Sequence, residues 1–326
     1  MRPNRPSISS VLAYGLAASM ALVAVGKMMS VDVPSLHALD ANLPYLAFGT
    51  FVVGLAALVF RQPTVMKGAF LSAALLSVVH RSSTLNVEPE SLVITPSSYA
   101  TLEVAQLNAD NLQPGAEGLE ALLAQRPDIV AVHGLTPVWA EFLADTLHDR
   151  YPFQYLYEDF GLQGIGIFAK QPVGTIDSVH IAGAVHVEAC LSGDARYREL
   201  NLVGVQTEPP LNSSAYLKLR SQLAALADRV ARVSEPTIVL GDFNSVPWSN
   251  EMYTFQEESA LLESRKSVQS TFIKGAPQLF EVPVEHIFYS PQLRCLGYEV
   301  MRVDDGYVGS CATFEDRDAR PKLASL

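Results

Sequence analysis

Two polar residues follow a strongly apolar run in the second half of the chain. The run 236–240 (PTIVL) has the aliphatic character of a buried strand, and it leads into Gly241, Asp242, Phe243 and Asn244. Residues two apart at a strand end point to the same side, so the Asp242 carboxylate and the Asn244 amide can act on one reactant. The carboxylate can serve as a base or a metal ligand, and the amide can donate to a phosphate oxygen. The alternative is structural, because Asp and Asn also cap turns.

Other polar residues stand at the ends of further predicted strands. Asn108 ends one such strand, Glu285 and His286 lie near the start of another, and His133 ends a third.

The elements that must position these residues alternate between short apolar runs and longer amphipathic ones. This alternation predicts a mixed α/β layered domain. Strands are predicted over 101–108, 127–134, 164–170, 178–191, 198–208, 236–244, 282–291, 294–303 and 309–315, and helices over 115–126, 137–151 and 216–233.

The order of these segments resembles the endonuclease/exonuclease/phosphatase superfamily, which includes DNase I-like nucleases, inositol phosphatases and bacterial sphingomyelinases. The resemblance covers about residues 100–316 and implies a four-layer α-β-β-α sandwich of DNase I-like type. The matching segments are the strand with Asn108, RPDIVAV at 126–132, GIGIFAKQPV at 164–173, the helix with Arg220, Gln222 and Leu223, GDFN at 241–244 and VEHIFYS at 284–290.

The chain departs from this family's pattern at four places. Gly134 stands where the family has a Mg²⁺-binding Glu, and glycine offers no carboxylate. Glu208 replaces the family's phosphate-contacting His after Thr207, and Glu285-His286 replaces Asp-His. The family's terminal Ser-Asp-His aligns with 310–312 (SCA), which carries no imidazole.

The resemblance therefore implies a vestigial site, and with it a pseudo-hydrolase that needs no metal. The site residues it implies are Asn108, Asp242, Asn244, Glu285 and His286. If the domain is an active phosphoesterase instead, Asp242 and Glu285 are the expected Mg²⁺ ligands. A rewired site built from His133, Asp110 and Asp242 is the alternative.

Three apolar stretches precede the domain and predict membrane spans over about 7–29, 42–60 and 64–80. We expect the first to be retained rather than cleaved as a signal peptide, because no small-x-small site follows it. Basic residues precede the first span and lie between the second and third, which predicts a cytoplasmic N-terminus in a bacterial inner membrane and a periplasmic domain. The predicted division is an anchor over 1–82, a linker over 83–98 and a domain over 99–320.

Charge and cysteine content narrow the functional classes. The chain has 34 acidic and 23 basic residues. Residues 1–90 contain four of the acidic and six of the basic ones, so residues 91–326 contain 30 acidic and 17 basic residues. Such an acidic domain argues against nucleic acid binding. The three cysteines Cys190, Cys295 and Cys311 allow one disulfide, with 295 and 311 the nearer pair, or three free thiols. The expected role is an accessory or docking subunit that binds an integral membrane protein or a second copy of itself; the alternative is an extracytoplasmic metal-dependent phosphodiesterase.

Overall fold

The computed structural model describes residues 40–84, 101–109, 116–160, 163–193, 197–265, 283–303 and 306–318, with scattered positions between 11 and 25. The chain divides into two units: Met1–Glu88 with Pro247–Tyr253, and Pro89–Val246 with Thr254–Leu326. Most of the predicted first span, the predicted linker beyond Thr84, and Asp110 lie outside the described residues.

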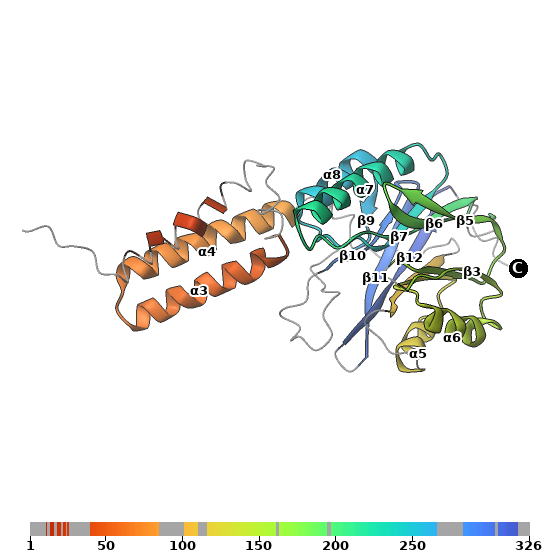
Figure 1. Ribbon diagram of the computed structural model, residues 1–326, viewed down its shortest axis with the longest axis horizontal. Helices are drawn as coiled ribbons and strands as arrows, with labels where there is room; N and C mark the ends of the chain where they lie inside the picture. The colour runs from red at the N-terminus through yellow and green to blue at the C-terminus, as the bar shows by residue number, and fades with distance from the viewer. Residues whose placement is uncertain are drawn as a thin grey trace, which may run out of the picture. The chain divides into compact units, whose positions relative to one another are not determined.

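A helical hairpin makes up most of what is described of the first unit (Figure 1). A 3-10 turn η1 (Asp40–Asn42) leads into α3 (Leu43–Val59), and a short turn leads into α4 (Pro63–Thr84). Pro44 lies in the first turn of α3, where a missing N–H removes no intrahelical hydrogen bond. A Cβ added at Gly54 would lie 2.6 Å from the Phe70 ring, so glycine lets the two helices approach closely.

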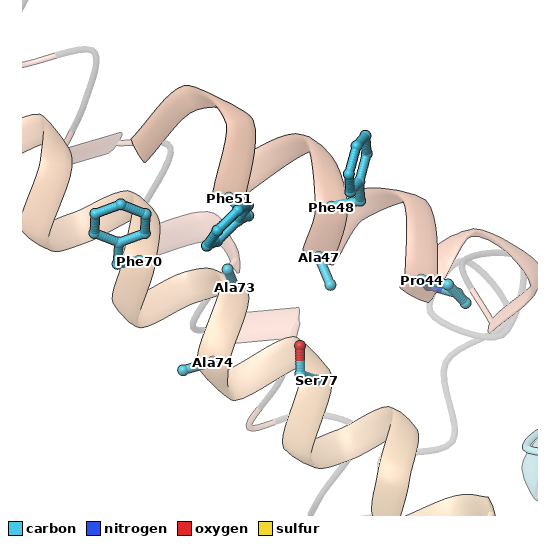
Figure 2. A pocket seen from close by; sticks show the side chains of 8 residues that line it. All are labelled: Pro44, Ala47, Phe48, Phe51, Phe70, Ala73, Ala74 and Ser77. Carbon is cyan, nitrogen blue, oxygen red and sulfur yellow. The ribbon is translucent and has the colours of Figure 1, made fainter. Parts of the chain in front are cut away.

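The hairpin exposes apolar side chains on its outer surface. Phe48, Leu58 and Val59 of α3 are each more than half exposed. A groove of about 600 Å³ opens between the helices (Figure 2). It is lined by Pro44, Ala47, Phe48, Phe51, Phe70, Ala73, Ala74 and Ser77.

The structure has helices at two of the predicted spans but does not support them as membrane spans. In place of the spans predicted over 42–60 and 64–80 the structure has α3, of 17 residues, and α4, of 22 residues. Among the described residues, no helix combines the length and the apolar character that crossing a membrane requires.

The second unit is built on two six-stranded mixed sheets. In the first sheet the strand order is β11-β12-β1-β2-β4-β3, and in the second it is β5-β6-β7-β8-β10-β9. The first sheet comprises β1 (Leu102–Asn108), β2 (Ile129–His133), β3 (Phe153–Tyr157), β4 (Ile165–Ala169), β11 (Leu293–Val303) and β12 (Gly306–Asp316). The second comprises β5 (Val173–Ile181), β6 (Ala184–Leu191), β7 (Leu200–Gln206), β8 (Thr237–Asp242), β9 (Leu262–Glu263) and β10 (Glu285–Tyr289).

The apolar core lies in layers, which confirms the predicted sandwich. Alternate side chains of both sheets, such as Ile129, Ile167, Leu202 and Leu240, pack against each other between the sheets. The opposite face of the first sheet packs on α5 (Ala116–Ala124) and α6 (Pro137–Leu147). Figure 1 shows α7 (Ser213–Ala231) beside the second sheet.

Several elements differ from the predictions. The predicted strand 178–191 is a hairpin, because Ala182 (φ 47°) and Gly183 (φ 83°) form a two-residue turn between β5 and β6. The short strands β3 and β9 and the helix α8 (Asn250–Ser259) were not predicted. Cys190, Cys295 and Cys311 are all free thiols. Cys295 pairs in register with Phe314 and Cys311 with Glu299, so the two cysteines do not face each other.

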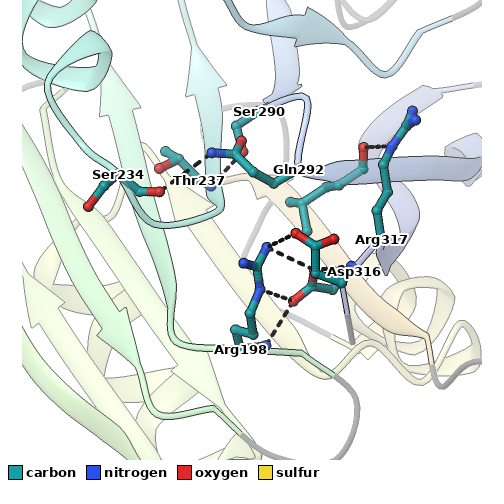
Figure 3. A network of polar contacts seen from close by, with 9 residues as sticks. Arg198, Ser234, Thr237, Ser290, Gln292, Asp316 and Arg317 are labelled. Atoms are coloured by element: carbon teal, nitrogen blue, oxygen red, sulfur yellow. Dashed lines mark hydrogen bonds and ion pairs between the residues drawn. The ribbon is translucent and has the colours of Figure 1, made fainter. Parts of the chain in front are cut away.

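A polar network ties the sheets together at the end opposite Asn108 (Figure 3). Arg198, just before β7, donates to both carboxylate oxygens of Asp316 at 3.1 Å, and its backbone N–H donates to the same group at 2.9 Å. The Asp316 side chain is fully buried, so this bidentate contact holds the end of β12 against the second sheet.

Candidate functional site

Three predicted site residues meet where strands of the two sheets end. Asn108 is the last residue of β1, Asp242 is the last of β8, and Glu285 is the first of β10. Glu285 and Asp242 are register partners in the second sheet. The Asn108 side-chain amide donates to Glu285 Oε1 at 2.7 Å from the other sheet. The predicted convergence of Asn108, Asp242 and Glu285 is therefore present in the structure.

Glu285 is the most perturbed acid of this cluster. Its side chain is fully buried, and both carboxylate oxygens are hydrogen-bonded, Oε1 to Asn108 and Oε2 to the Tyr307 hydroxyl. Burial and the nearby Asp242 charge raise the pKa of Glu285 to about 8, against the opposing effect of Tyr307, Asn108 and Arg265. The Glu285 carboxyl therefore tends to keep its proton at neutral pH.

Tyr307 was not predicted, and a local irregularity in β12 explains why. Met301 pairs with Gly309 but Arg302 pairs with Tyr307, so Val308 is an extra residue in the strand. Such a bulge shifts the alternation of side chains and re-aims the next one. Tyr307 consequently reaches Glu285, whereas the Ser310 hydroxyl, in the segment aligned with the family's terminal Ser-Asp-His, accepts from the Gln106 amide at 3.0 Å. Burial and Glu285 raise the pKa of Tyr307 well above its usual value.

Asp242 and Asn244 hold the turn that follows β8. Asp242 Oδ1 accepts from the backbone N–H of Asn244 at 2.9 Å, and Oδ2 lies 3.4 Å from the Gln206 amide. Asn244 has a φ of 48°, which Asn tolerates better than most residues, and its amide donates to the Thr207 carbonyl at 2.9 Å. Asp242 lies in the cluster, whereas Asn244 makes the contacts of a turn residue.

His286 faces away from this cluster, contrary to the prediction. Successive residues of a strand point to opposite faces, so Glu285 and His286 are directed to different sides of the sheet. His286 is fully buried, with Nδ1 2.7 Å from Glu263 Oε2 and Nε2 2.9 Å from the Ser245 carbonyl oxygen. Its ring also stacks on Phe288. These contacts make His286 part of the packing behind the site.

The His133 ring packs against Gly241, the residue before Asp242. A Cβ at Gly241, whose φ is 150°, would lie 1.9 Å from the Val205 carbonyl oxygen and 2.9 Å from His133 Cε1. His133 is fully buried, neither ring nitrogen has a hydrogen-bond partner among the described residues, and burial lowers its pKa to about 3. The neutral ring therefore packs against the glycine, and Gly134 follows it with a φ of 67°.

These residues do not fit a magnesium ion. Mg²⁺ requires oxygen ligands in a near-octahedral array, usually from carboxylates. The oxygens of Glu285 and Asp242 already accept hydrogen bonds, and Gly134 supplies no side-chain oxygen. Within the described part of the chain, no group of three or more His, Cys, Asp or Glu side chains is arranged to hold a metal.

The profile of the Endonuclease/Exonuclease/phosphatase family matches residues 105–314. The fold is similar to an endonuclease/exonuclease/phosphatase from Beutenbergia cavernae, with a TM-score of 0.53, 17% identity, and coverage of 68% of this chain and 72% of that one.

Two further solved structures share the fold. The TDP2 protein of D. rerio, solved with a single-strand DNA product, gives a TM-score of 0.54, 17% identity, and coverage of 66% and 99%. ANGEL2, described as a 2′,3′-cyclic phosphatase, gives a TM-score of 0.54 and 12% identity, and the match covers 67% of this chain and 96% of that one. No curated protein sequence matches the chain.

Proposed function

Because the chain belongs to the Endonuclease/Exonuclease/phosphatase family, we propose that its domain has lost phosphoester hydrolysis and serves as a membrane-attached docking subunit. The observation that carries this proposal is the state of Glu285. Its two oxygens are bound by Asn108 and Tyr307, and its carboxyl retains a proton to a pKa of about 8. A protonated acid held by two donors is a poor ligand for a divalent cation.

Proton transfer is also disfavoured in this arrangement. A general base works best with a pKa near the working pH and within reach of solvent or substrate. Tyr307 has its pKa raised well above 10, and His133 and His286 are fully buried. Asp242 is the remaining carboxylate, and it lies partly engaged with Asn244 and Gln206. Loss of metal and base together would remove most of the rate enhancement.

The hairpin supports attachment to a membrane. A helix that exposes Phe and Leu side chains around its surface is stable in a lipid environment and costly in water. In α3, Phe48, Leu58 and Phe60 just beyond its end are exposed. We place the protein in a bacterial inner membrane, with the N-terminus cytoplasmic and the domain periplasmic.

We do not propose that this chain binds single-strand DNA, the product present in the TDP2 structure. Beyond residue 90 the chain holds 30 acidic and 17 basic residues, and this balance repels a phosphate backbone. We propose instead that the partner is an integral membrane protein.

The test compares turnover with co-purification. Full-length protein is purified in a mild detergent and assayed with bis-p-nitrophenyl phosphate and p-nitrophenyl phosphate, with Mg²⁺ or Mn²⁺. The expected result is a rate no higher than that of Asp242→Asn, together with a stoichiometric membrane protein in the preparation. A metal-dependent rate that falls at least about 100-fold in Asp242→Asn would overturn the proposal, since general-base groups contribute on that scale.

A further inference from the structure

The most exposed large apolar side chains of the domain gather at the end that carries the site. Among the described residues of the domain, only four large apolar side chains are more than half exposed: Val138, Phe160, Leu211 and Leu217. Phe160 is 92% exposed and Leu211 is 85% exposed. Single exposed apolar residues are common on protein surfaces, so their shared location is the informative feature.

Two of the four follow from the first sheet. β2 ends at His133, and the chain continues through Gly134–Thr136 into α6, whose second residue is Val138. Phe160 lies in the connection from β3 to β4, and the first residue of β4, Ile165, pairs with His133. Val138 and Phe160 therefore lie at the same end of the first sheet as Asn108, the last residue of β1.

The other two follow from the second sheet. β7 ends at Gln206, the register partner of Asp242, and the next residues form a loop with Leu211 before α7 begins at Ser213. Leu217 lies in the second turn of α7. Because Asn108 and Glu285 join the two sheets at this end, all four apolar residues lie at the same end of the domain. We call it the rim, defined by Val138, Phe160, Leu211 and Leu217.

The rim loops are held in place by local hydrogen bonds. Pro209 and Pro210 restrict the backbone before Leu211, whose N–H donates to the Pro209 carbonyl at 2.8 Å. Asn212 Oδ1 then caps α7 by accepting from two backbone N–H groups at 3.0 Å. Beside Phe160, the N–H of Asp159 donates to the Leu135 carbonyl at 3.2 Å. A loop backbone that is already held in this way loses less conformational entropy on binding, which favours a docking role.

Charged residues near the rim indicate the charge of a partner that could bind there. Glu141, Glu158, Asp159 and Glu208 are acidic and at least partly exposed. The basic residues nearby are Lys218, which pairs with Glu208 at 3.2 Å, and Arg220 on α7. Among the residues of these loops and helices that the structure describes, acidic groups outnumber basic ones, so an anionic surface is repelled and a cationic one attracted.

We infer that the rim is the docking face for a protein segment that carries apolar side chains flanked by Lys or Arg. This rests on the proposed docking function and names the surface and the partner's chemistry. The rim residues insert into the partner's apolar surface, while the acidic residues fix its orientation.

The test is photo-crosslinking of the full-length protein in native membranes. Benzoylphenylalanine is placed at Phe160, at Leu211 and, as a control, at Phe153, which begins β3 at the opposite end of the domain. The expected result is one protein adduct shared by positions 160 and 211 and absent at 153. The crosslinked peptide, mapped by mass spectrometry, should contain Lys or Arg next to apolar residues. Adding Asp159→Lys and Glu208→Lys should lower the adduct yield about tenfold.

Three results would overturn the inference. The first is equal crosslinking at 153 and 160. The second is an acidic mapped peptide, and the third is adducts with lipid alone, which would assign the rim to the bilayer surface. A partner that still co-purifies without crosslinking at 160 or 211 would reject this face and leave the docking function standing. Metal-dependent turnover would instead reject the docking function itself.

Discussion

Replacing Glu285 with Gln should remove a loss of stability that the wild-type protein suffers as the pH rises from about 4.5 to 8. In the unfolded chain a Glu carboxyl titrates near 4.5, whereas the folded environment raises the pKa of Glu285 to about 8. Between these values the folded protein binds one more proton than the unfolded chain. The free energy of unfolding contributed by this group is therefore full below pH 4.5 and is lost as the pH rises to 8.

The size of this loss follows from the two pKa values. A difference of about 3.5 units at 1.36 kcal/mol per unit corresponds to about 5 kcal/mol, as an upper value for a buried group. Gln cannot ionise, so Glu285→Gln removes this loss. Its amide nitrogen cannot accept the second hydrogen bond that Asn108 or Tyr307 now makes, which costs about 1–3 kcal/mol. The variant should be less stable than the wild type at pH 4.5 and more stable at pH 8.5, crossing between about pH 5 and 7.

The assay is urea unfolding of the full-length protein in detergent, followed by near-ultraviolet circular dichroism at half-unit steps from pH 4.5 to 9. The exposed Glu235→Gln is the matched control, and its stability curve should run parallel to that of the wild type. Parallel curves for wild type and Glu285→Gln would refute the reasoning, because they would show that Glu285 is ionised across this range.

Three further predictions concern single residues around the site and at the far end. Burial lowers the pKa of His133 from 6.5 to about 3, so the contribution of His133 to stability is lost as the pH falls from 6.5 towards 3. In His133→Asn the midpoint of urea unfolding should therefore depend less on pH over this range than in the wild type. An equal pH dependence in both proteins would contradict this. Gly241→Ala places a Cβ 1.9 Å from the Val205 carbonyl oxygen and should abolish protease resistance, whereas Gly183→Asn, with open space around it, should retain it. Asp316→Asn should lower the free energy of unfolding by about 3 kcal/mol, because it breaks the buried contact with Arg198. The control Asp318→Asn, at an exposed residue, should lower it by at most about 0.5 kcal/mol. Equal effects of the two substitutions would show that the contact between Arg198 and Asp316 adds nothing to stability.

The sequence was sufficient to predict the layered fold, and three of the five residues assigned to the site, Asn108, Asp242 and Glu285, do lie together in the structure. Strands β8 and β10 are short runs with an apolar centre, and β1 (LEVAQLN) has strand character, so these three strands could be predicted from the sequence. The resemblance to the family then assigned Asn108, Asp242 and Glu285 to the site. His286 was assigned to the site by resemblance. The alternation of a strand excludes this, since Glu285 and His286 are adjacent.

Other features could not be predicted from local pattern. The turn at Ala182–Gly183 interrupts a continuous apolar run, and Ala is an uncommon residue at a φ of 47°. The position of Tyr307 depends on the extra residue Val308, and a bulge leaves no periodicity to detect. The pKa of Glu285 depends on burial by segments that are far apart in the chain, which no local spacing reveals.

The strand order of the first sheet has a consequence for how the protein is made. β12, the last strand synthesised, lies between β1, the first, and β11, with Leu102 opposite Phe314. Until the ribosome releases the end of the chain, β1 has an unpaired edge and the first sheet remains incomplete. Contacts across so long a sequence separation form slowly, and open strand edges invite association with other chains. Translation of this protein should therefore require a chaperone that shields β1 until Asp316 emerges, and truncation before β12 should yield aggregates rather than a smaller domain.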